Sequence, residues 1–279
     1  MLDAGNFNQF VKARYGHIVY NKNDMFVGKA IETYGEYSEW EVKLFRQICQ
    51  PGSLTMDIGA NIGTHTLAMA RFVGEEGFVY AFEPQQIVFQ TLCANMAINS
   101  ISNVGCLPYG VSDKDYYTQI PRIDYTKEAN YGALKLHQFE SGNKVKVISL
   151  DSYFRDARFQ SLDFIKIDVE GMEDKVLTGA KDLIGKFRPI MYIENDKIEK
   201  SKGLIRLVKS MDYIPYWHYP PLYNSNNYFG VKENIYPNIV SINMICIPTE
   251  NTMTIKGVTE ATDEDYHILN DKGEGIIYG

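Results

Sequence analysis

One stretch decides the fold: Met56 to Pro84, which is MDIGANIGTHTLAMARFVGEEGFVYAFEP. Residues 53–58, which start just before this stretch, are short and mainly apolar and predict a buried strand. A turn with two glycines follows, and then apolar residues recur at helical spacing over residues 64–73. Residues 78–82 predict a second buried strand, of the kind found in parallel sheets. The order strand, glycine turn, helix, strand therefore indicates a doubly wound α/β fold.

Polar residues and glycines stand where these two strands end. In open α/β sheets, ligands bind beyond the carboxyl ends of the strands. Gly59 and Gly63 permit a tight turn with positive φ, or a close approach by a ligand. Glu83 lies 24 residues after Gly59 (83 − 59), near the spacing of roughly 20 at which an acid binds ribose hydroxyls. We therefore expect a nucleoside here, with Asp57 facing its cationic or amine end.

The glycine pattern disfavours a ligand with a pyrophosphate. Counted from Gly59, the fingerprint G-x-G-x-x-G would need glycine where Asn61 and Thr64 stand, and the sequence has no glycine–lysine phosphate loop. S-adenosylmethionine fits such a pocket, whereas NAD fits it poorly, which disfavours a nicotinamide dehydrogenase. The alternative is that the two glycines only form a strand-to-helix turn; Asp57, Asn61 and Glu83 in register weigh against it.

Composition indicates one large α/β domain. The chain has 279 residues, of which 45% are hydrophobic, enough for a sizeable core. A net charge of −7 gives no electrostatic reason to expect nucleic-acid binding. The sequence shows no apolar signal region and no membrane-spanning stretch. We expect a cytoplasmic protein because the cysteines lack a C-x-x-C spacing and resemble reduced core residues: Cys49, Cys93, Cys106 and Cys246.

The rest of the chain continues the alternation of helices and strands. Further helices are predicted over residues 38–49, 84–99, 170–186 and 197–211. Further strands are predicted over residues 104–111, 145–150, 162–169 and 190–193. Residues 213–218 and 240–247 predict a closing antiparallel pair. The expected architecture is a Rossmann-like, mostly parallel sheet whose last strand is antiparallel.

Four motifs together resemble the FkbM family of S-adenosylmethionine-dependent methyltransferases. They are residues 56–66, AFEP at 81–84, IKIDVEG at 165–171 and Arg188-Pro189, and the resemblance spans about residues 35–200. It implies a class I methyltransferase sheet and, usually, O-methylation of a sugar or natural product, so a small molecule or glycan is the expected substrate. It also implies a cofactor site formed by Asp57, Gly59, Asn61, Gly63 and Glu83, with Pro84 beside them.

An alcohol acceptor must lose its proton, so we expect a base or a metal ion near the ends of the fourth and fifth strands. Lys166 stands within an apolar strand and shares a face with Asp168. Lys166 is interpreted as a base with a lowered pKa or as a cation that orients the substrate. The alternative is a structural pair of Lys166 with Asp168 or Glu194. The remaining catalytic candidates are Asp168, His65 and His218.

A second polar cluster contains Asp168, Glu170, Glu194 and Asn195. In catechol-type O-methyltransferases, acids and an asparagine at these two strand ends hold Mg²⁺, and hard oxygen ligands suit that ion. Glu170 has another explanation, because an acid is favourable near the positive end of the helix that follows. Mg²⁺ is thus not favoured, and a metal-dependent small-molecule O-methyltransferase remains an alternative. A non-catalytic cofactor-binding protein of the same fold is another.

Residues that flank the sheet complete the hypothesis. Tyr34 and Glu36 precede the first helix and are expected to meet the methionine amine or the substrate, and Asp113 to accept from the adenine amine. For each of them an ordinary packing or surface role is the alternative. The Tyr- and Asn-rich segment 219–238 suits a polyhydroxylated ligand. The expected division is an N-terminal segment with a covering helix (1–50), a methyltransferase domain (51–250) and a polar tail (251–279).

Overall fold

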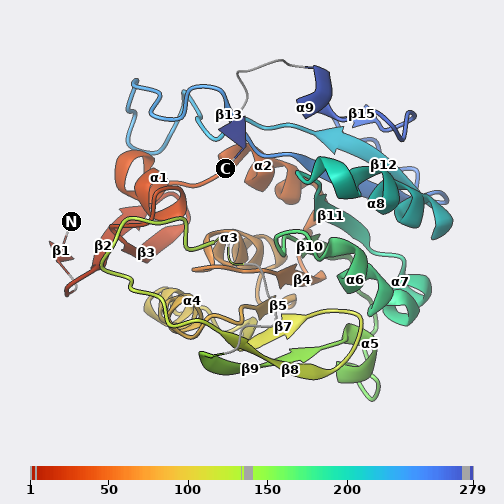
Figure 1. The fold of residues 1–279 in the computed structure, drawn as a ribbon, viewed down its shortest axis with the longest axis horizontal. Coiled ribbons are helices and arrows are strands. Elements are labelled where there is room, and N and C mark those ends of the chain that lie inside the picture. Colours follow the sequence, from red (N-terminus) through yellow and green to blue (C-terminus); the bar gives the residue numbers. More distant parts are fainter. Residues whose placement is uncertain (1, 4, 133, 135–140, 272–276, 279) are drawn as a thin grey trace.

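The computed structural model describes residues 2–3, 5–132, 134, 141–271 and 277–278. In this part of the chain an eight-stranded sheet runs through the molecule, with helices on both of its faces (Figure 1). In spatial order its strands are β15 (Thr259–Glu260), β12 (Tyr213–His218), β14 (Asn243–Pro248), β11 (Ile190–Glu194), β10 (Phe164–Ile167), β4 (Leu54–Ile58), β5 (Phe78–Phe82) and β6 (Val104–Leu107).

The topology of this sheet creates a crevice at its centre. The five strands from β6 to β11 are mutually parallel, and β14 is antiparallel to both β11 and β12. After β4 the chain adds β5 and β6 on one side and later adds β10 and β11 on the other. The strand order therefore reverses between β4 and β10, the point where ligands bind in doubly wound sheets. The predicted Rossmann-like class I methyltransferase sheet with an antiparallel last strand is confirmed.

Two apolar layers fix the helices on the sheet. One face packs against α5 (Leu150–Tyr153), α6 (Glu173–Thr178), α7 (Lys181–Phe187) and α8 (Ile198–Ser210). The other face packs against α2 (Glu39–Ile48) and α3 (Thr64–Val73), and α4 (Gln86–Ile98) lies beside β6. Successive residues of β4 and β10 point to opposite faces of the sheet. Because helices cover both faces, both sets of side chains are mainly apolar. In the described residues no helix is long and apolar enough to cross a membrane.

Three smaller sheets surround the central one. The N-terminal sheet contains β1 (Leu2–Asp3), β2 (Asn8–Ala13) and β3 (Gly16–Asn21), and α1 (Val27–Tyr34) follows it. A second small sheet contains β7 (Tyr109–Val111), β8 (Tyr116–Ile120) and β9 (Asn143–Ile148). The remaining elements are β13 (Ile239–Val240), its partner β16 (Ile277–Tyr278) and α9 (Ile268–Asp271).

Three predicted elements are divided in the structure. The strand predicted over residues 240–247 is interrupted between β13, which ends at Val240, and β14 (Asn243–Pro248). The strand predicted over residues 104–111 is broken at Pro108, so that β6 stays in the central sheet and β7 pairs with β9 instead. The helix predicted over residues 170–186 becomes α6 and α7, which are separated at Gly179 and Ala180. A side chain at Gly179 would lie 2.1 Å from the Ser112 carbonyl oxygen, so this break lets the helical segment pass close to the end of β7.

Candidate functional site

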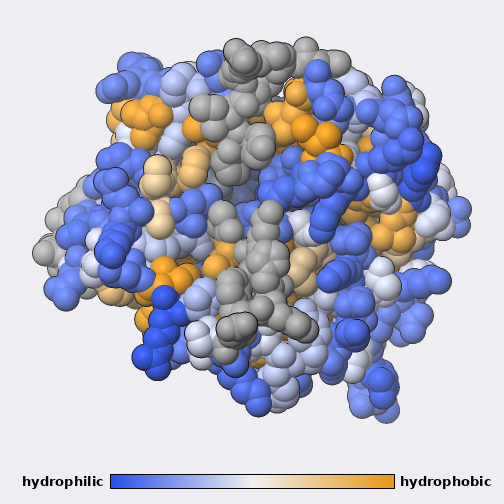
Figure 2. Space-filling model, in the orientation of Figure 1, coloured by the Kyte–Doolittle hydropathy of each residue, from blue (hydrophilic) through white to orange (hydrophobic). Residues whose placement is uncertain are grey.

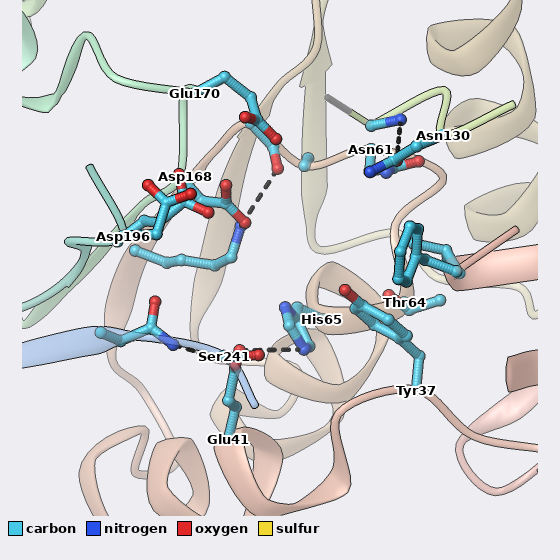
Figure 3. Close-up of a pocket in the computed structure, with 18 of the residues that line it drawn as sticks. Tyr37, Glu41, Asn61, Thr64, His65, Asn130, Asp168, Glu170, Asp196 and Ser241 are labelled. Atoms are coloured by element: carbon cyan, nitrogen blue, oxygen red, sulfur yellow. Dashed lines mark hydrogen bonds and ion pairs between the residues drawn. The ribbon is translucent and has the colours of Figure 1, made fainter. Parts of the chain in front are cut away.

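A pocket opens at the carboxyl ends of β4, β5, β10 and β11. Its described lining is strongly acidic and includes Lys166 and His65 beside six acids: Glu41, Glu83, Asp168, Glu170, Glu194 and Asp196. Figure 3 shows four of these acids, Glu41, Asp168, Glu170 and Asp196. A smaller lobe adjoins it and shares Gly59, Glu83 and Asp168 with it. The walls of that lobe are mainly apolar and include Phe82, Pro84, Tyr109, Val111, Leu134 and Val169. Figure 2 shows the surrounding surface as mostly hydrophilic, with separate apolar patches.

The glycine turn after β4 is required by packing. Gly59 has φ +80°, and a Cβ atom built on it would lie 1.8 Å from the Asp168 carbonyl oxygen. Gly63 has φ +84°, and its Cβ would lie 2.5 Å from Leu92 Cδ1. Gly59 lines the pocket, whereas Gly63 faces α4 and does not belong to the described lining. The turn therefore brings β4, β10 and α4 close together, and only its first glycine also borders the ligand space.

Glu83 ends β5 and points into the pocket. One of its oxygens accepts from the backbone N–H of Asn61 (3.0 Å) and the other from that of Gln85 (2.9 Å). Asn61 itself stands at φ +50°, so the turn aims its N–H at the acid. Burial raises the pKa of Glu83 to about 7, although the two hydrogen bonds oppose that rise. Each oxygen keeps a lone pair for a further donor, so the carboxylate can accept two ligand hydroxyls.

Lys166 is a structural cation. In the parallel register Lys166 lies opposite Asp57, and its Nζ is 3.2 Å from Asp57 Oδ1, 3.3 Å from Asp168 Oδ2 and 3.1 Å from the Gly59 carbonyl oxygen. Burial alone would lower the pKa of Lys166, but the carboxylates of Asp168, Asp57 and Glu41 raise it above its ordinary value. The interpretation of Lys166 as a base with a lowered pKa is therefore wrong. The predicted pair with Asp168 is present, and the strand register adds Asp57.

Asp57 is also absent from the described lining of the pocket. Its side chain is fully buried, and its second oxygen accepts from the Thr66 hydroxyl at 2.6 Å. The structure thus places Asp57 under the glycine turn, where it holds Lys166 and α3 together. It does not bring Asp57 to the ligand space where the sequence placed it.

Three carboxylates gather where β10 and β11 end. One oxygen from each of Asp168, Glu170 and Glu194 lies within 4.8 Å of the others, a spacing that a cation could bridge. Glu194 Oε2 is buried without a hydrogen-bond partner. Burial, and then the charge of Asp168, raises the pKa of Glu170 to about 7, and the same two causes raise the pKa of Glu194 well above its ordinary value. Asn195 does not belong to the described lining of the pocket; its side-chain amide donates to Ser201 Oγ, and its backbone carbonyl oxygen accepts from His267.

His65 and Glu41 face each other across the pocket floor (Figure 3). His65 comes from the first turn of α3 and Glu41 from α2, and their Nε2 and Oε2 atoms are 3.7 Å apart. Burial lowers the pKa of His65 to about 3, so its ring is neutral at pH 7. The sequence pattern marks Glu41 only as the acid of a capping box, three residues after Ser38 at the start of an amphipathic helix, and not as a site residue.

A family model, the Methyltransferase FkbM domain, matches residues 57–215, more than half of the chain. The chain belongs to the FkbM methyltransferase family. Curated relatives agree: Methyltransferase 1 of Beauveria bassiana is 30% identical over 148 residues, which are 47% of this chain and 59% of that protein. The 2-O-methyltransferase NoeI of Sinorhizobium fredii is 24% identical, over 62% of this chain and 77% of that protein. The hexuronic acid methyltransferase AglP of Haloferax volcanii is 27% identical, over 51% of this chain and 56% of that protein.

Membership in the FkbM family supports an enzyme of the methyltransferase class. The chain matches about 60% of the length of the Beauveria relative and of another fungal methyltransferase, sdnD of Sordaria araneosa. A solved FkbM methyltransferase from Methylobacillus flagellatus is 16% identical, with a TM-score of 0.44 over 74% of this chain and 50% of that one.

In this FkbM chain, several predicted site residues lie away from the pocket. Glu36 binds Arg14 (2.6 Å), the Asn224 amide and the Tyr228 backbone (both 2.8 Å). The Tyr34 hydroxyl accepts from the Ile235 N–H (2.8 Å) in a small aromatic core. Both therefore anchor segment 219–238, whose residues are all described and do not line the pocket.

Asp113 and His218 also stand elsewhere. Asp113 follows β7, which has left the central sheet, and its exposed carboxylate accepts from the Ser112 hydroxyl at 3.0 Å. His218 ends β12 and lies 2.8 Å from the Tyr192 hydroxyl, and burial lowers its pKa to about 4. It borders a separate groove beside Trp40. Of the predicted catalytic and cofactor residues with an acidic or imidazole side chain, Glu83, Asp168 and His65 line the pocket, together with Glu170 and Glu194 of the predicted metal cluster.

Proposed function

We propose that this protein transfers a methyl group from S-adenosylmethionine to a hydroxyl group of a sugar, glycan or sugar-bearing metabolite. The single observation that carries the proposal is Glu83, a carboxylate that ends β5 inside the pocket with its oxygens held by two backbone N–H groups. An acid so fixed at a strand end, beside a glycine turn, suits a ribose diol.

The remaining pocket residues fit the cofactor. The apolar lobe bounded by Phe82, Tyr109 and Val111 offers the surface that an adenine ring needs. The acidic lining favours a ligand with a sulfonium and an ammonium group. Lys166, the lysine of the described lining, is already paired with two carboxylates. It therefore offers little positive charge to neutralise a bound phosphate. When bound, the cofactor supplies an electrophilic methyl group.

A hydroxyl acceptor is supported by chemistry and by relatives. Carboxylates accept from hydroxyl donors, and Asn130, Ser241 and Asn243 in the lining can donate and accept. NoeI is named a 2-O-methyltransferase and AglP a hexuronic acid methyltransferase. The proposed role of the chain's own residues is to bind the acceptor, to align it and to exclude water.

Calorimetric titration with S-adenosylhomocysteine tests the cofactor site. Glu83→Ala removes two charge-assisted hydrogen bonds to the ribose, each worth about 1.5–3 kcal/mol, so affinity should fall more than about 100-fold. Glu83→Gln keeps the size of the side chain and one acceptor oxygen, so its affinity should fall less. Glu76→Ala, an exposed acid of the same stretch, is the matched control. Undiminished affinity in folded Glu83→Ala would remove Glu83 from the cofactor site.

The carboxylates of Asp168, Glu170 and Glu194 favour a second candidate, a metal-dependent O-methyltransferase. Their oxygens would hold Mg²⁺, which would polarise an acceptor hydroxyl. Titration of Mg²⁺ into the protein should then release heat that Glu194→Gln abolishes. Methyl transfer from tritiated S-adenosylmethionine to p-nitrophenyl glycosides that is unchanged by EDTA would reject this candidate while leaving the first intact.

A further inference from the structure

We infer that Glu41 takes the proton of the acceptor hydroxyl, and that His65 orients that hydroxyl from the opposite side. The inference rests on the proposed function, because it assumes an alcohol acceptor in the pocket beside β10. It assigns the proton acceptor to α2, the helix that precedes the matched family domain and that the sequence identified only as a covering element.

The spacing of this pair matches one bridging oxygen atom. Glu41 Oε2 and His65 Nε2 are 3.7 Å apart, too far for a direct hydrogen bond. His65 Nε2 is buried and has no hydrogen-bond partner among the residues that the structure describes. A hydroxyl oxygen about 2.8 Å from each atom would satisfy both at once. Glu41 Oε1 accepts from the Asn243 amide at 3.2 Å, which fixes the carboxylate with its other oxygen toward His65.

The other basic groups of the lining are less suited. Lys166 Nζ is surrounded by three acceptors and its pKa is raised, so it stays protonated. His65 is neutral but a very weak base, since burial lowers its pKa to about 3. Asp168 is paired with Lys166. Burial raises the pKa of Glu41 to about 7, against a hydrogen bond from Ser241, which matches the range in which general bases work best. Burial raises the pKa of Glu83 and Glu170 to about 7 as well, but Glu83 is the proposed ribose ligand and Glu170 is paired with Lys197, whereas Glu41 faces His65.

The step balances without a further reactant. The acceptor O–H bond breaks, its proton passes to Glu41 Oε2, and the acceptor oxygen forms a bond to the methyl carbon. The carbon–sulfur bond breaks, and its electron pair stays on sulfur as a neutral thioether. One positive and one negative charge are lost together, so the transfer leaves the net charge of the pocket unchanged.

Glu41→Gln is the decisive variant, because it keeps the volume of the side chain and an oxygen that can accept from Asn243. At saturating tritiated S-adenosylmethionine, with the p-nitrophenyl glycoside that the wild-type protein methylates fastest, kcat should fall about 10²–10⁴-fold. Affinity for S-adenosylhomocysteine, measured by calorimetry, should stay within threefold. Glu39→Gln is the matched control: it is a second buried acid of α2, but it faces Tyr15 and Arg14 outside the pocket.

The pH profile separates a base from a packing residue. In the wild-type protein, log kcat should rise with unit slope below pH 7 and level off above it, because activity is lost as Glu41 becomes protonated. The groups that face Glu41 are His65 from α3, Lys166 and Asp168 from β10, Tyr192 from β11, and Tyr37 before α2. Saturating cofactor keeps the titration of Glu83 out of kcat. In Glu41→Gln the slope should disappear.

Two results would overturn the inference. One is a Glu41→Gln variant with kcat within threefold of the wild-type value and the same pH slope. The other is a variant that loses S-adenosylhomocysteine affinity in proportion to kcat, which would make Glu41 a structural residue. If the wild-type protein binds S-adenosylhomocysteine but methylates none of the glycosides, the proposed function fails and the inference with it, so the two failures are distinguishable.

Discussion

Gly59→Ala tests whether the turn after β4 is set by packing against β10. The added Cβ would lie 1.8 Å from the Asp168 carbonyl oxygen and 2.9 Å from its carbonyl carbon. Real Cβ contacts essentially never fall under 3.0 Å, so the two backbones must separate by about 1.2 Å or more. The Asp168 N–H donates to the Ile58 carbonyl oxygen at 3.0 Å. The carbonyl group of Asp168 therefore cannot move aside without disturbing the pairing of β10 with β4.

Two costs add up in this variant. A non-glycine residue at φ +80° costs about 1–2 kcal/mol, and overpacking a close contact costs about 1–3 kcal/mol. We therefore expect the free energy of unfolding to fall by about 2–5 kcal/mol. Gly52→Ala isolates the first cost, because Gly52 has φ +87° with no atom within 4 Å of the built Cβ. Its expected loss is about 1–2 kcal/mol.

Urea unfolding of both variants measures this difference, and calorimetry with S-adenosylhomocysteine measures its consequence for binding. Gly59→Ala should bind at least tenfold more weakly than Gly52→Ala, because the displaced backbone lies in the pocket lining. If Gly59→Ala unfolds within about 0.5 kcal/mol of Gly52→Ala and binds equally well, the turn is not held by contact with β10 and the argument fails.

Two further predictions concern buried charge. Lys166→Met leaves the fully buried Asp57 without its cation, so the free energy of unfolding measured in urea should fall by about 3–5 kcal/mol. Adding Asp57→Asn to this variant should recover part of the loss, and a double variant with no recovery would contradict the pairing. Binding of S-adenosylhomocysteine should strengthen from pH 6 to pH 8 and release protons, because ribose donors favour the ionised form of Glu83 and burial raises the pKa of that group to about 7. The Glu83→Gln variant should lose this pH dependence. A wild-type affinity that does not change with pH would contradict the assignment of Glu83.

The sequence predicts the central fold well because its signals are local. Residues 64–73 and 78–82 match α3 and β5, where helical spacing and a continuous apolar run depend only on neighbouring residues. The division of the strand over residues 104–111 was not predictable in this way, because Pro108 ends one ladder while the partner of β7 lies far along the chain in β9. Strand partners at such distances leave no local pattern.

The candidate site is predictable where it follows from strand ends. Glu83 and Asp168 lie in the pocket because carboxyl ends of parallel strands meet at one edge of the sheet. Asp57 and Glu36 have the right residue type, but other buried groups already occupy their oxygens. Glu41 was missed because its role depends on how α2 packs against α3, a tertiary contact that sequence spacing does not encode.

The buried acids of the pocket have a cost in stability that the proposed cofactor would offset. The pKa values of Glu41 and Glu83 are raised from 4.5 to about 7, so each group costs stability as the pH rises through that interval. At 1.36 kcal/mol per pH unit, the cost approaches about 3 kcal/mol for each group. A cationic sulfonium offsets this cost when it binds, whereas the neutral thioether that remains after transfer does not. Under the proposed chemistry, the acidic lining would therefore favour the reactive, cationic cofactor over its neutral-sulfur product.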